Sequence, residues 1–188
     1  MDKLLDKTMT FLQKNQDMDQ DTADIVRYGL ELFLIKTSFS IVMLVIGALF
    51  HSFSECLAFL ISFYLIRSSS GGYHADTRLK CFVQSVTTFV AVILIVKAVE
   101  AYELLLIPVA LVSCFSAGVI WLFAPVDNEN KRLDEDEFLQ FRKKSRIILA
   151  VEIAISLIFV FIGWVQLSCA VMLALVVTAI LLLLGKIK

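Results

Sequence analysis

The chain alternates between long apolar runs and short polar segments. The six runs cover residues 29–50, 52–66, 82–99, 104–124, 147–163 and 165–184. A helix that crosses the hydrocarbon core of a bilayer needs roughly 20 apolar residues, with about 17 as a lower limit. The pattern therefore predicts six transmembrane helices. The second run is short by this measure, so either it begins inside the turn at 51–54 or the polar stretch after it dips into the bilayer.

The composition is that of a membrane protein. Hydrophobic residues make up 59% of the 188 residues, against about 45–50% in a typical soluble domain. The sequence therefore predicts an all-α integral membrane protein with a single domain over residues 1–188. The four cysteines lack the spacing of a disulfide framework, and no cleavable signal is expected because residues 1–24 are polar.

The N-terminal segment, residues 1–28, is polar with scattered apolar positions. Up to residue 14 the apolar positions share one helical face, which consists of Leu4, Leu5, Met9 and Leu12. That spacing predicts an amphipathic helix lying on the membrane surface. A short solvated helix would show the same spacing, so both interpretations stay open.

The distribution of basic residues predicts the orientation of the helices. If the N-terminus is cytoplasmic, the cytoplasmic segments hold all of the 17 Lys and Arg residues except Lys36 and Lys97. The turns on the opposite side hold none. Because cytoplasmic loops of membrane proteins are enriched in Lys and Arg, we expect both termini, a polar stretch at residues 67–81 and a loop at 125–146 to be cytoplasmic.

The polar stretch, residues 67–81, carries the candidate chemistry. His74 and Cys81 are the residue types of a general base and a thiol nucleophile. In one straight helix they would share a face but stand about 10 Å apart, at roughly 1.5 Å per residue, whereas proton transfer needs roughly 3 Å or one bridging water. A catalytic pair therefore requires His74 to fold back over the turn that bears Cys81. Gly71 and Gly72 give the backbone the freedom for such a turn.

The surroundings of Cys81 favour a reactive thiolate if a helix begins just before it. Arg78 and Lys80 flank the thiol, and the free N–H groups of a helix start can also hold an oxyanion. The alternative is that Cys81 is a small apolar filler and His74 a solvated loop residue. Spacing alone leaves both interpretations open.

The loop at 125–146 contains carboxylates followed by a basic cluster. Asp127 and Glu129 have neither His nor Cys beside them, so a solvated charge run explains them and no metal site is expected. No other cofactor is expected in the chain.

Two motifs together resemble the AgrB family, the accessory gene regulator B proteases that process quorum-sensing peptides. The first motif is Arg67, the sequence GGYHA beginning at Gly71, and Cys81, all between the second and third runs. The second is FAPVDNENK at residues 123–131, directly after the fourth run. The resemblance extends over nearly the whole chain, including its length and the layout of its apolar runs.

The resemblance implies a cysteine endopeptidase of the bacterial cell membrane. In such an enzyme Cys81 attacks a carbonyl of a short propeptide, and His74 acts as general base and then as acid. The cleaved peptide is held as an acyl-thioester on Cys81, which leads to a cyclic thiolactone or lactone autoinducing peptide. The implied substrate is an AgrD-like amphipathic propeptide with an acidic tail. The implied protease is a homodimer in the lipid bilayer and binds no nucleic acid.

The resemblance also implies substrate-binding or loop-positioning roles for further residues. These are Arg67, Gly71, Gly72, Arg78, Lys80, Asp127 and Lys131. Arg67 could bind a substrate carboxylate, fix the loop, or anchor a cytoplasmic segment through its charge. The basic half of the 125–146 loop could attract the acidic tail of the substrate or anionic lipid.

The main alternative function is that of a small membrane peptide transporter or exporter without proteolytic activity. A transporter predicts polar residues near span centres and interrupted helices, and the six runs are largely free of both. A non-catalytic scaffold is a further alternative, and it would leave the GGYH sequence without a reason.

Overall fold

The computed structural model describes residue 6 and residues 8–10, 19–73, 78–126 and 134–187. These residues form α-helices, one short 3-10 helix and an isolated β-bridge, which confirms the all-α prediction. The chain divides into two compact units, Met1–Met43 and Leu44–Lys188.

The first unit consists of most of α2, Gln20–Leu49, and a short helical piece before it. Asp6 and residues 8–10 are helical, and an ion pair of 3.0 Å joins the Asp6 carboxylate to Arg27. Both side chains are more than half exposed, so water screens the pair. The predicted amphipathic helix at 1–14 lies largely outside the described residues and stays a prediction.

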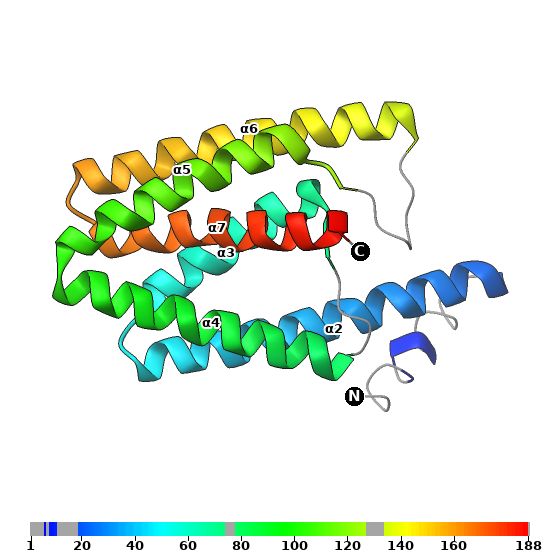
Figure 1. The fold of residues 1–188 in the computed structure, drawn as a ribbon. Helices are drawn as coiled ribbons and strands as arrows, with labels where there is room; N and C mark the ends of the chain where they lie inside the picture. Colours follow the sequence, from blue (N-terminus) through cyan, green and yellow to red (C-terminus); the bar gives the residue numbers. More distant parts are fainter. Residues whose placement is uncertain (1–5, 7, 11–18, 74–77, 127–133, 188) are drawn as a thin grey trace. The chain divides into compact units, whose positions relative to one another are not determined.

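The described part of the second unit is a helical bundle arranged around α7, Val165–Ile187 (Figure 1). α7 packs against each of the four other long helices of this unit. These are α3 (Phe53–Ser70), α4 (Arg78–Ala101), α5 (Leu106–Phe123) and α6 (Glu135–Phe161), with the 3-10 helix η1 (Glu103–Leu105) before α5. The last helix of the chain therefore provides the surface on which the others assemble.

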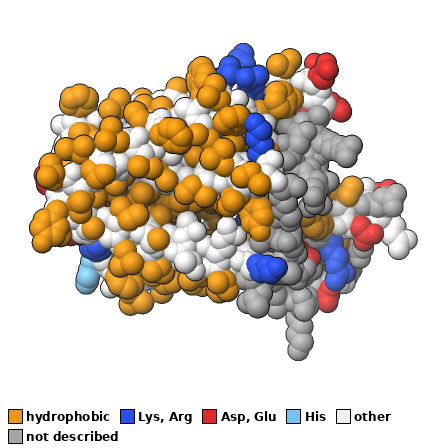
Figure 2. All heavy atoms as spheres, in the orientation of Figure 1, with side chains coloured by type: hydrophobic (Ala, Val, Ile, Leu, Met, Phe, Trp, Pro, Cys, Tyr) orange, Lys and Arg blue, Asp and Glu red, His pale blue; other side chains and the backbone are white. Residues whose placement is uncertain are grey.

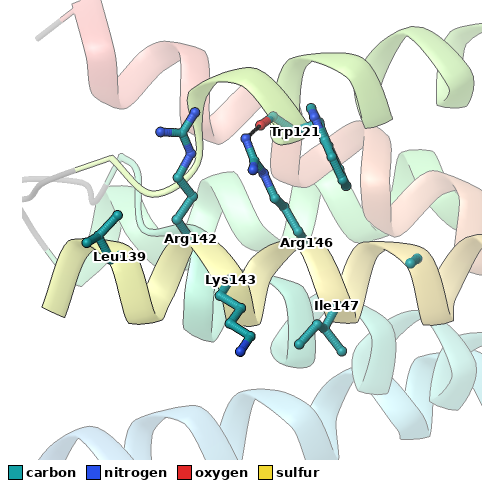
Figure 3. A pocket seen from close by; sticks show the side chains of 7 residues that line it. Trp121, Leu139, Arg142, Lys143, Arg146 and Ile147 are labelled. Atoms are coloured by element: carbon teal, nitrogen blue, oxygen red, sulfur yellow. Dashed lines mark hydrogen bonds between the residues drawn. The ribbon is translucent and has the colours of Figure 1, made fainter. Parts of the chain in front are cut away.

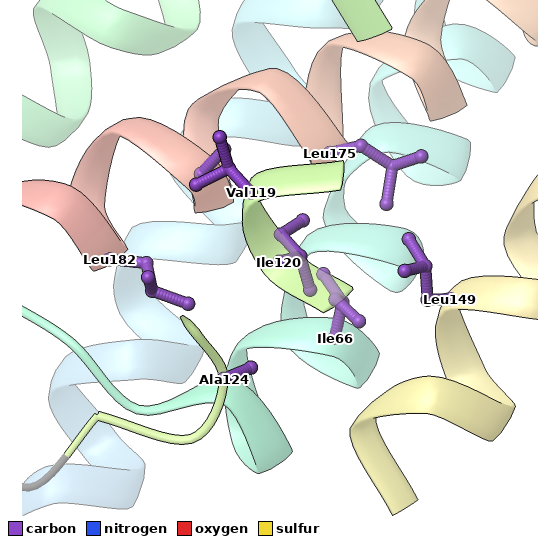
Figure 4. Packing of buried hydrophobic residues seen from close by; sticks show 8 residues of the cluster. Ile66, Val119, Ile120, Ala124, Leu149, Leu175 and Leu182 are labelled. Atoms are coloured by element: carbon purple, nitrogen blue, oxygen red, sulfur yellow. The ribbon is translucent and has the colours of Figure 1, made fainter. Parts of the chain in front are cut away.

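A cluster of buried aliphatic side chains joins α3, α5, α6 and α7 (Figure 4). Ile66 of α3, Ile120 of α5 and Leu182 of α7 are at most 1% exposed, and Leu149 of α6 and Leu175 of α7 pack with them. Burial of apolar surface contributes about 25 cal/mol per Å². The cluster thus holds the C-terminal end of α3, where the polar stretch begins, against α7.

Four stretches of the described residues are long and apolar enough to cross a membrane. They are Thr22–Leu49, Lys80–Ala101, Glu103–Phe123 and Val165–Ile187. The predicted six-span layout is therefore confirmed only in part, because α3 and α6 do not qualify. Their polar ends are the physical reason: α3 finishes with Arg67 and a serine run, and α6 is charged up to Arg146. The predicted re-entrant segment between the second and third spans is not confirmed, and its residues 74–77 lie outside the described ones.

Hydrophobic side chains cover much of the face seen in Figure 2. On α5, Leu111 and Phe115 are 68% and 74% exposed. An apolar surface of this kind is unfavourable in water, whereas in a bilayer it contacts lipid tails that are equally apolar. The exposed hydrophobic side chains thus fit helices that face lipid.

The predicted cytoplasmic loop at 125–146 is shorter in the structure. α6 begins at Glu135, so the basic cluster at 142–146 is helical. Three acidic side chains occupy the first turn of α6: Glu135, Asp136 and Glu137. Negative charge at a helix N-terminus interacts favourably with the helix dipole, which explains why the helix starts well before the apolar run.

One carboxyl group in the bundle is buried without compensation from the described residues. Glu152 of α6 is 2% exposed, and neither of its carboxyl oxygens has a hydrogen-bond partner among them. A buried polar group without a partner costs about 1–3 kcal/mol. Glu152 is therefore a site at which the fold can be stabilised.

Replacement of Glu152 by methionine, which has a similar length and no oxygen, is expected to raise the melting temperature in detergent. A gain of about 1–3 kcal/mol, at about 2–4 °C per kcal/mol for a chain of this size, gives an increase of about 2–12 °C. Thermal unfolding of the purified protein measures it, with Glu103→Met at an exposed carboxylate as the control. A lower melting temperature for Glu152→Met than for the parent would contradict the expectation.

Candidate active site

Residues 71–73, here called the diglycine segment, follow the end of α3, and the first of them pairs with the chain after α5. Gly71 forms a parallel β-bridge with Val126, and the Val126 N–H donates a hydrogen bond of 3.0 Å to the Ser70 carbonyl. Gly71 has a φ of +66°, and a Cβ there would collide with the Val126 carbonyl oxygen. Glycine is therefore required at residue 71 both for its backbone conformation and for this close contact.

The other side of the diglycine segment lies against the C-terminal part of α7. The Tyr73 N–H donates a hydrogen bond of 2.9 Å to the Leu181 carbonyl. Gly72, with a φ of +106°, leaves no room for a side chain, because a Cβ would lie 2.6 Å from the Arg67 Nη1 and 2.9 Å from the Leu181 carbonyl oxygen. On the helix side, a Cβ at Gly185 would lie 2.7 Å from the Gly72 Cα. Two facing glycines thus permit the backbone of the segment to touch the helix.

Arg67 holds the diglycine segment from the α3 side. Its Nη2 donates a hydrogen bond to the Tyr73 carbonyl, while its Nη1 is buried without a hydrogen-bond partner among the described residues. Burial lowers the pKa of Arg67 to about 10, and the negative charge of a Cys81 thiolate acts in the opposite direction, raising that pKa. The guanidinium thus stays protonated at neutral pH and lies within electrostatic reach of Cys81.

Cys81 lies in the first turn of α4, which begins at Arg78. Its side chain is exposed, as is that of Lys80, and its thiol is free. The expected helix start just before Cys81 is therefore present. His74, Asp127 and Lys131 lie outside the described residues, and for Arg78 only the backbone is described.

Of the predicted site residues, the structure brings Arg67, Gly71 and Gly72 together, with Cys81 near enough to act on Arg67 electrostatically. Sequence reasoning missed Leu181 and Gly185, the docking partners on α7. The signal for them in the sequence was weak: a single glycine at the end of a leucine-rich run.

A hydroxyl pair ties this site to α6. Ser70, the last residue of α3, and Ser145 of α6 are both buried, and their hydroxyl oxygens are 3.1 Å apart. Ser70 also donates to the Ile66 carbonyl at 2.8 Å, so the Ser145 hydroxyl is the donor in the pair if Ser70 keeps that bond. The start of the diglycine segment is therefore fixed by α6 as well as by α7.

Replacement of Arg67 by lysine is expected to lower the rate at which iodoacetamide alkylates the Cys81 thiol about tenfold. Lysine keeps the positive charge but loses the planar fork that reaches the Tyr73 carbonyl, and a charge-assisted hydrogen bond contributes about 1.5–3 kcal/mol. Arg67→Gln is expected to lower this alkylation rate further, because it also removes the positive charge. The rate of alkylation of Cys81 by iodoacetamide measures the effect, with Arg27→Gln, an exposed arginine of the first unit, as the control. Equal alkylation rates in the parent protein and Arg67→Gln would show that Arg67 has no influence on the thiol.

The chain was compared with known proteins and protein families. The family model described as accessory gene regulator B matches residues 5–183. The chain belongs to the AgrB family. The accessory gene regulator protein B of Staphylococcus aureus strain MW2 is 31% identical over 156 residues, which cover 83% of this chain and 82% of the relative. A putative AgrB-like protein 1 of Clostridium perfringens strain 13 is 26% identical over 170 residues, which cover 88% of each chain.

Membership in the AgrB family assigns the chain a role in the accessory gene regulator quorum-sensing system. The four described stretches that are long and apolar enough to cross a membrane are compatible with a membrane protein of this family. No solved structure matches the chain significantly.

Proposed function

We propose that this AgrB protein is a membrane cysteine endopeptidase that cleaves a short AgrD-like propeptide. The observation that carries the proposal is the environment of Cys81. Its exposed thiol lies in the first turn of α4 and within electrostatic reach of the protonated, half-buried Arg67. A cysteine sulfur is the nucleophile that attacks a peptide carbonyl, and the exposed position of Cys81 leaves its sulfur accessible to a bound peptide.

The proposed reaction has two acyl transfers. First, the Cys81 thiolate attacks the scissile carbonyl, a tetrahedral intermediate forms, and the amine of the C-terminal fragment leaves with a proton from His74. The N-terminal part of the propeptide is then bound as a thioester. Second, a thiol or hydroxyl within that peptide gives its proton to His74, attacks the thioester and releases Cys81. The product is a cyclic thiolactone or lactone, and no water is consumed.

The diglycine segment has a positioning role in this proposal. It leads directly into His74 and is held at Gly71 by Val126 and at Tyr73 by Arg67 and Leu181. A base must lie within hydrogen-bond reach of the thiol that it deprotonates. A fixed segment on one side of His74 and the start of α4 on the other restrict where the imidazole can lie, which supports a His74 that folds back toward Cys81.

The membrane arrangement belongs to the proposal as well. The distribution of basic residues supports a multi-pass protein with both termini and the His74–Cys81 stretch in the cytoplasm. A homodimer is the proposed assembly, and an amphipathic propeptide at the membrane surface is the proposed substrate.

Trapping the covalent intermediate tests the proposed chemistry. The purified protein in lipid nanodiscs is mixed with a synthetic propeptide whose internal cysteine is replaced by alanine, so that ring closure is blocked. We expect the intact protein mass to rise by the mass of the N-terminal fragment, and neutral hydroxylamine to remove the adduct as it removes a thioester. Cys81→Ala is expected to give no adduct. An adduct of equal yield in Cys81→Ala would exclude Cys81 as the nucleophile.

The same experiment separates the protease from a peptide exporter. An exporter without proteolytic activity would move the intact propeptide across a vesicle membrane and leave both the protein and the peptide masses unchanged. Peptide fragments and a Cys81 adduct are expected only for the endopeptidase.

A further inference from the structure

A groove with both basic and apolar lining lies between the end of α5 and the N-terminal half of α6 (Figure 3). We call it the basic groove; its cavity volume is about 610 Å³. The lining residues are Trp121, Leu139, Arg142, Lys143, Arg146, Ile147 and Ala150. Neither the proposed reaction nor the diglycine segment uses any of these side chains.

Two arginines concentrate positive charge in the basic groove. Arg142 and Arg146 extend from α6 toward the same side as Trp121 of α5 (Figure 3), and the Arg146 guanidinium lies 4.5 Å from the centre of the Trp121 ring. The Nε atoms of both arginines are buried and have no hydrogen-bond partner among the described residues. None of the lining residues is acidic. Arg146 Nη2 also donates a hydrogen bond of 3.4 Å to the Trp121 carbonyl. The groove therefore presents two guanidinium groups with no acidic side chain in its lining, which suits a phosphate.

Part of the lining is apolar, and on α6 two of its apolar residues follow the arginines toward the middle of the helix. Ile147 and Ala150 continue along α6 from Arg146 and are exposed. Trp121 lies in the last turn of the apolar stretch Glu103–Phe123, and tryptophan is enriched where a membrane helix meets the headgroup region. A polar end at headgroup depth and an apolar end toward the hydrocarbon match one kind of ligand, a molecule with a charged head and hydrocarbon chains.

We propose that the basic groove binds an anionic phospholipid, whose phosphate lies at Arg142 and Arg146 and whose acyl chain lies along Ile147 and Ala150. Ser145 lies between the two arginines in the sequence and faces the hydroxyl of Ser70. The lipid therefore binds on the helix that also fixes the start of the diglycine segment. The inference does not depend on the proposed proteolysis, and its test needs no substrate.

Lipid-specific quenching of Trp121 fluorescence tests the site. The protein has two tryptophans, and Trp164 lies in the turn between α6 and α7, beyond the other end of α6, so Trp164→Phe leaves Trp121 as the reporter. This variant is reconstituted in phosphatidylcholine vesicles that contain either brominated phosphatidylglycerol or brominated phosphatidylcholine at equal mole fraction. Each arginine is expected to strengthen binding of the anionic lipid by about 1 kcal/mol, which is about fivefold. With two arginines we expect phosphatidylglycerol to bind beside Trp121 about 25-fold more strongly than phosphatidylcholine. The reverse reporter, Trp121→Phe, is expected to show no such preference.

The charge variants identify which residues carry the preference. Arg142→Gln and Arg146→Gln are each expected to lower the preference for phosphatidylglycerol about fivefold. Lys144→Gln removes the same charge from an exposed residue outside the groove, and we expect it to leave the preference unchanged. Quenching by brominated phosphatidylcholine in every variant shows that the protein is inserted. Equal quenching by both lipids, or an equal loss in Lys144→Gln and Arg142→Gln, would refute the site.

Soluble competitors distinguish the lipid from other anions. Glycerol phosphate at millimolar concentration and a short acidic peptide at micromolar concentration are each expected to leave quenching by brominated phosphatidylglycerol unchanged. Displacement by glycerol phosphate would overturn the lipid assignment in favour of a free phosphate site. Displacement by the peptide would overturn it in favour of a peptide-binding surface.

Discussion

Cys81→Ala is expected to lower propeptide cleavage by on the order of 10⁴-fold or more, the scale of loss when a nucleophile is removed from a protease. Without the thiol no thioester can form, and the remaining groups only hold the peptide. Mass-spectrometric quantification of the C-terminal fragment, released by protein in nanodiscs at a fixed propeptide concentration, measures the effect.

Cys114→Ala is the matched control for this experiment. Cys114 of α5 is also an exposed, free thiol, but it lies within a lipid-facing apolar helix, so its replacement is expected to leave the cleavage rate unchanged. If Cys81→Ala retained more than about 1% of the parent rate, Cys81 could not be the nucleophile.

Gly185→Ala is expected to lower cleavage about 100-fold, although Gly185 is remote in sequence from the proposed catalytic pair. The new Cβ would lie 2.5 Å from the Tyr73 nitrogen and 2.7 Å from the Gly72 Cα. Both are backbone atoms that cannot rotate away, so the diglycine segment must shift. A displacement of about 1 Å in an active site costs about 10²-fold in rate, and overpacking costs about 1–3 kcal/mol of stability. The cleavage rate and the melting temperature, both in detergent, measure the two effects.

Gly118→Ala is the control: it is the same glycine-to-alanine substitution at a helical residue where the added Cβ makes no close contact. Gly118 is a helical residue of α5, and a Cβ added there would have no neighbouring atom within 4 Å. Alanine is a better helix former than glycine by about 1 kcal/mol. We therefore expect Gly118→Ala to be neutral or slightly stabilising and fully active. Full activity in Gly185→Ala as well would mean that docking of the diglycine segment on α7 is not needed for cleavage.

Local features of this protein were predictable from the sequence. The apolar runs gave the approximate positions of the helices from α2 to α7, and the helix start considered just before Cys81 is present at Arg78. The requirement for glycine at residues 71 and 72 was also expected, because a turn there needs backbone conformations that other residues rarely adopt. Each of these inferences depends only on residues that are close to one another in the sequence.

Features that depend on contacts between distant segments were not predictable. The hydrogen bond from Tyr73 to Leu181 and the bridge from Gly71 to Val126 join segments that no local pattern connects. The six-span count is confirmed only in part, because α3 and α6 include polar and charged residues and fall short of the apolar composition of a spanning helix.

The docking of the diglycine segment on α7 has a consequence for biosynthesis. A ribosome makes the diglycine segment more than 100 residues before Leu181 and Gly185, because the chain is synthesised from its N-terminus. The contacts of the segment with α7 therefore form only after α7 has been synthesised, and until then the segment is unsupported on that side.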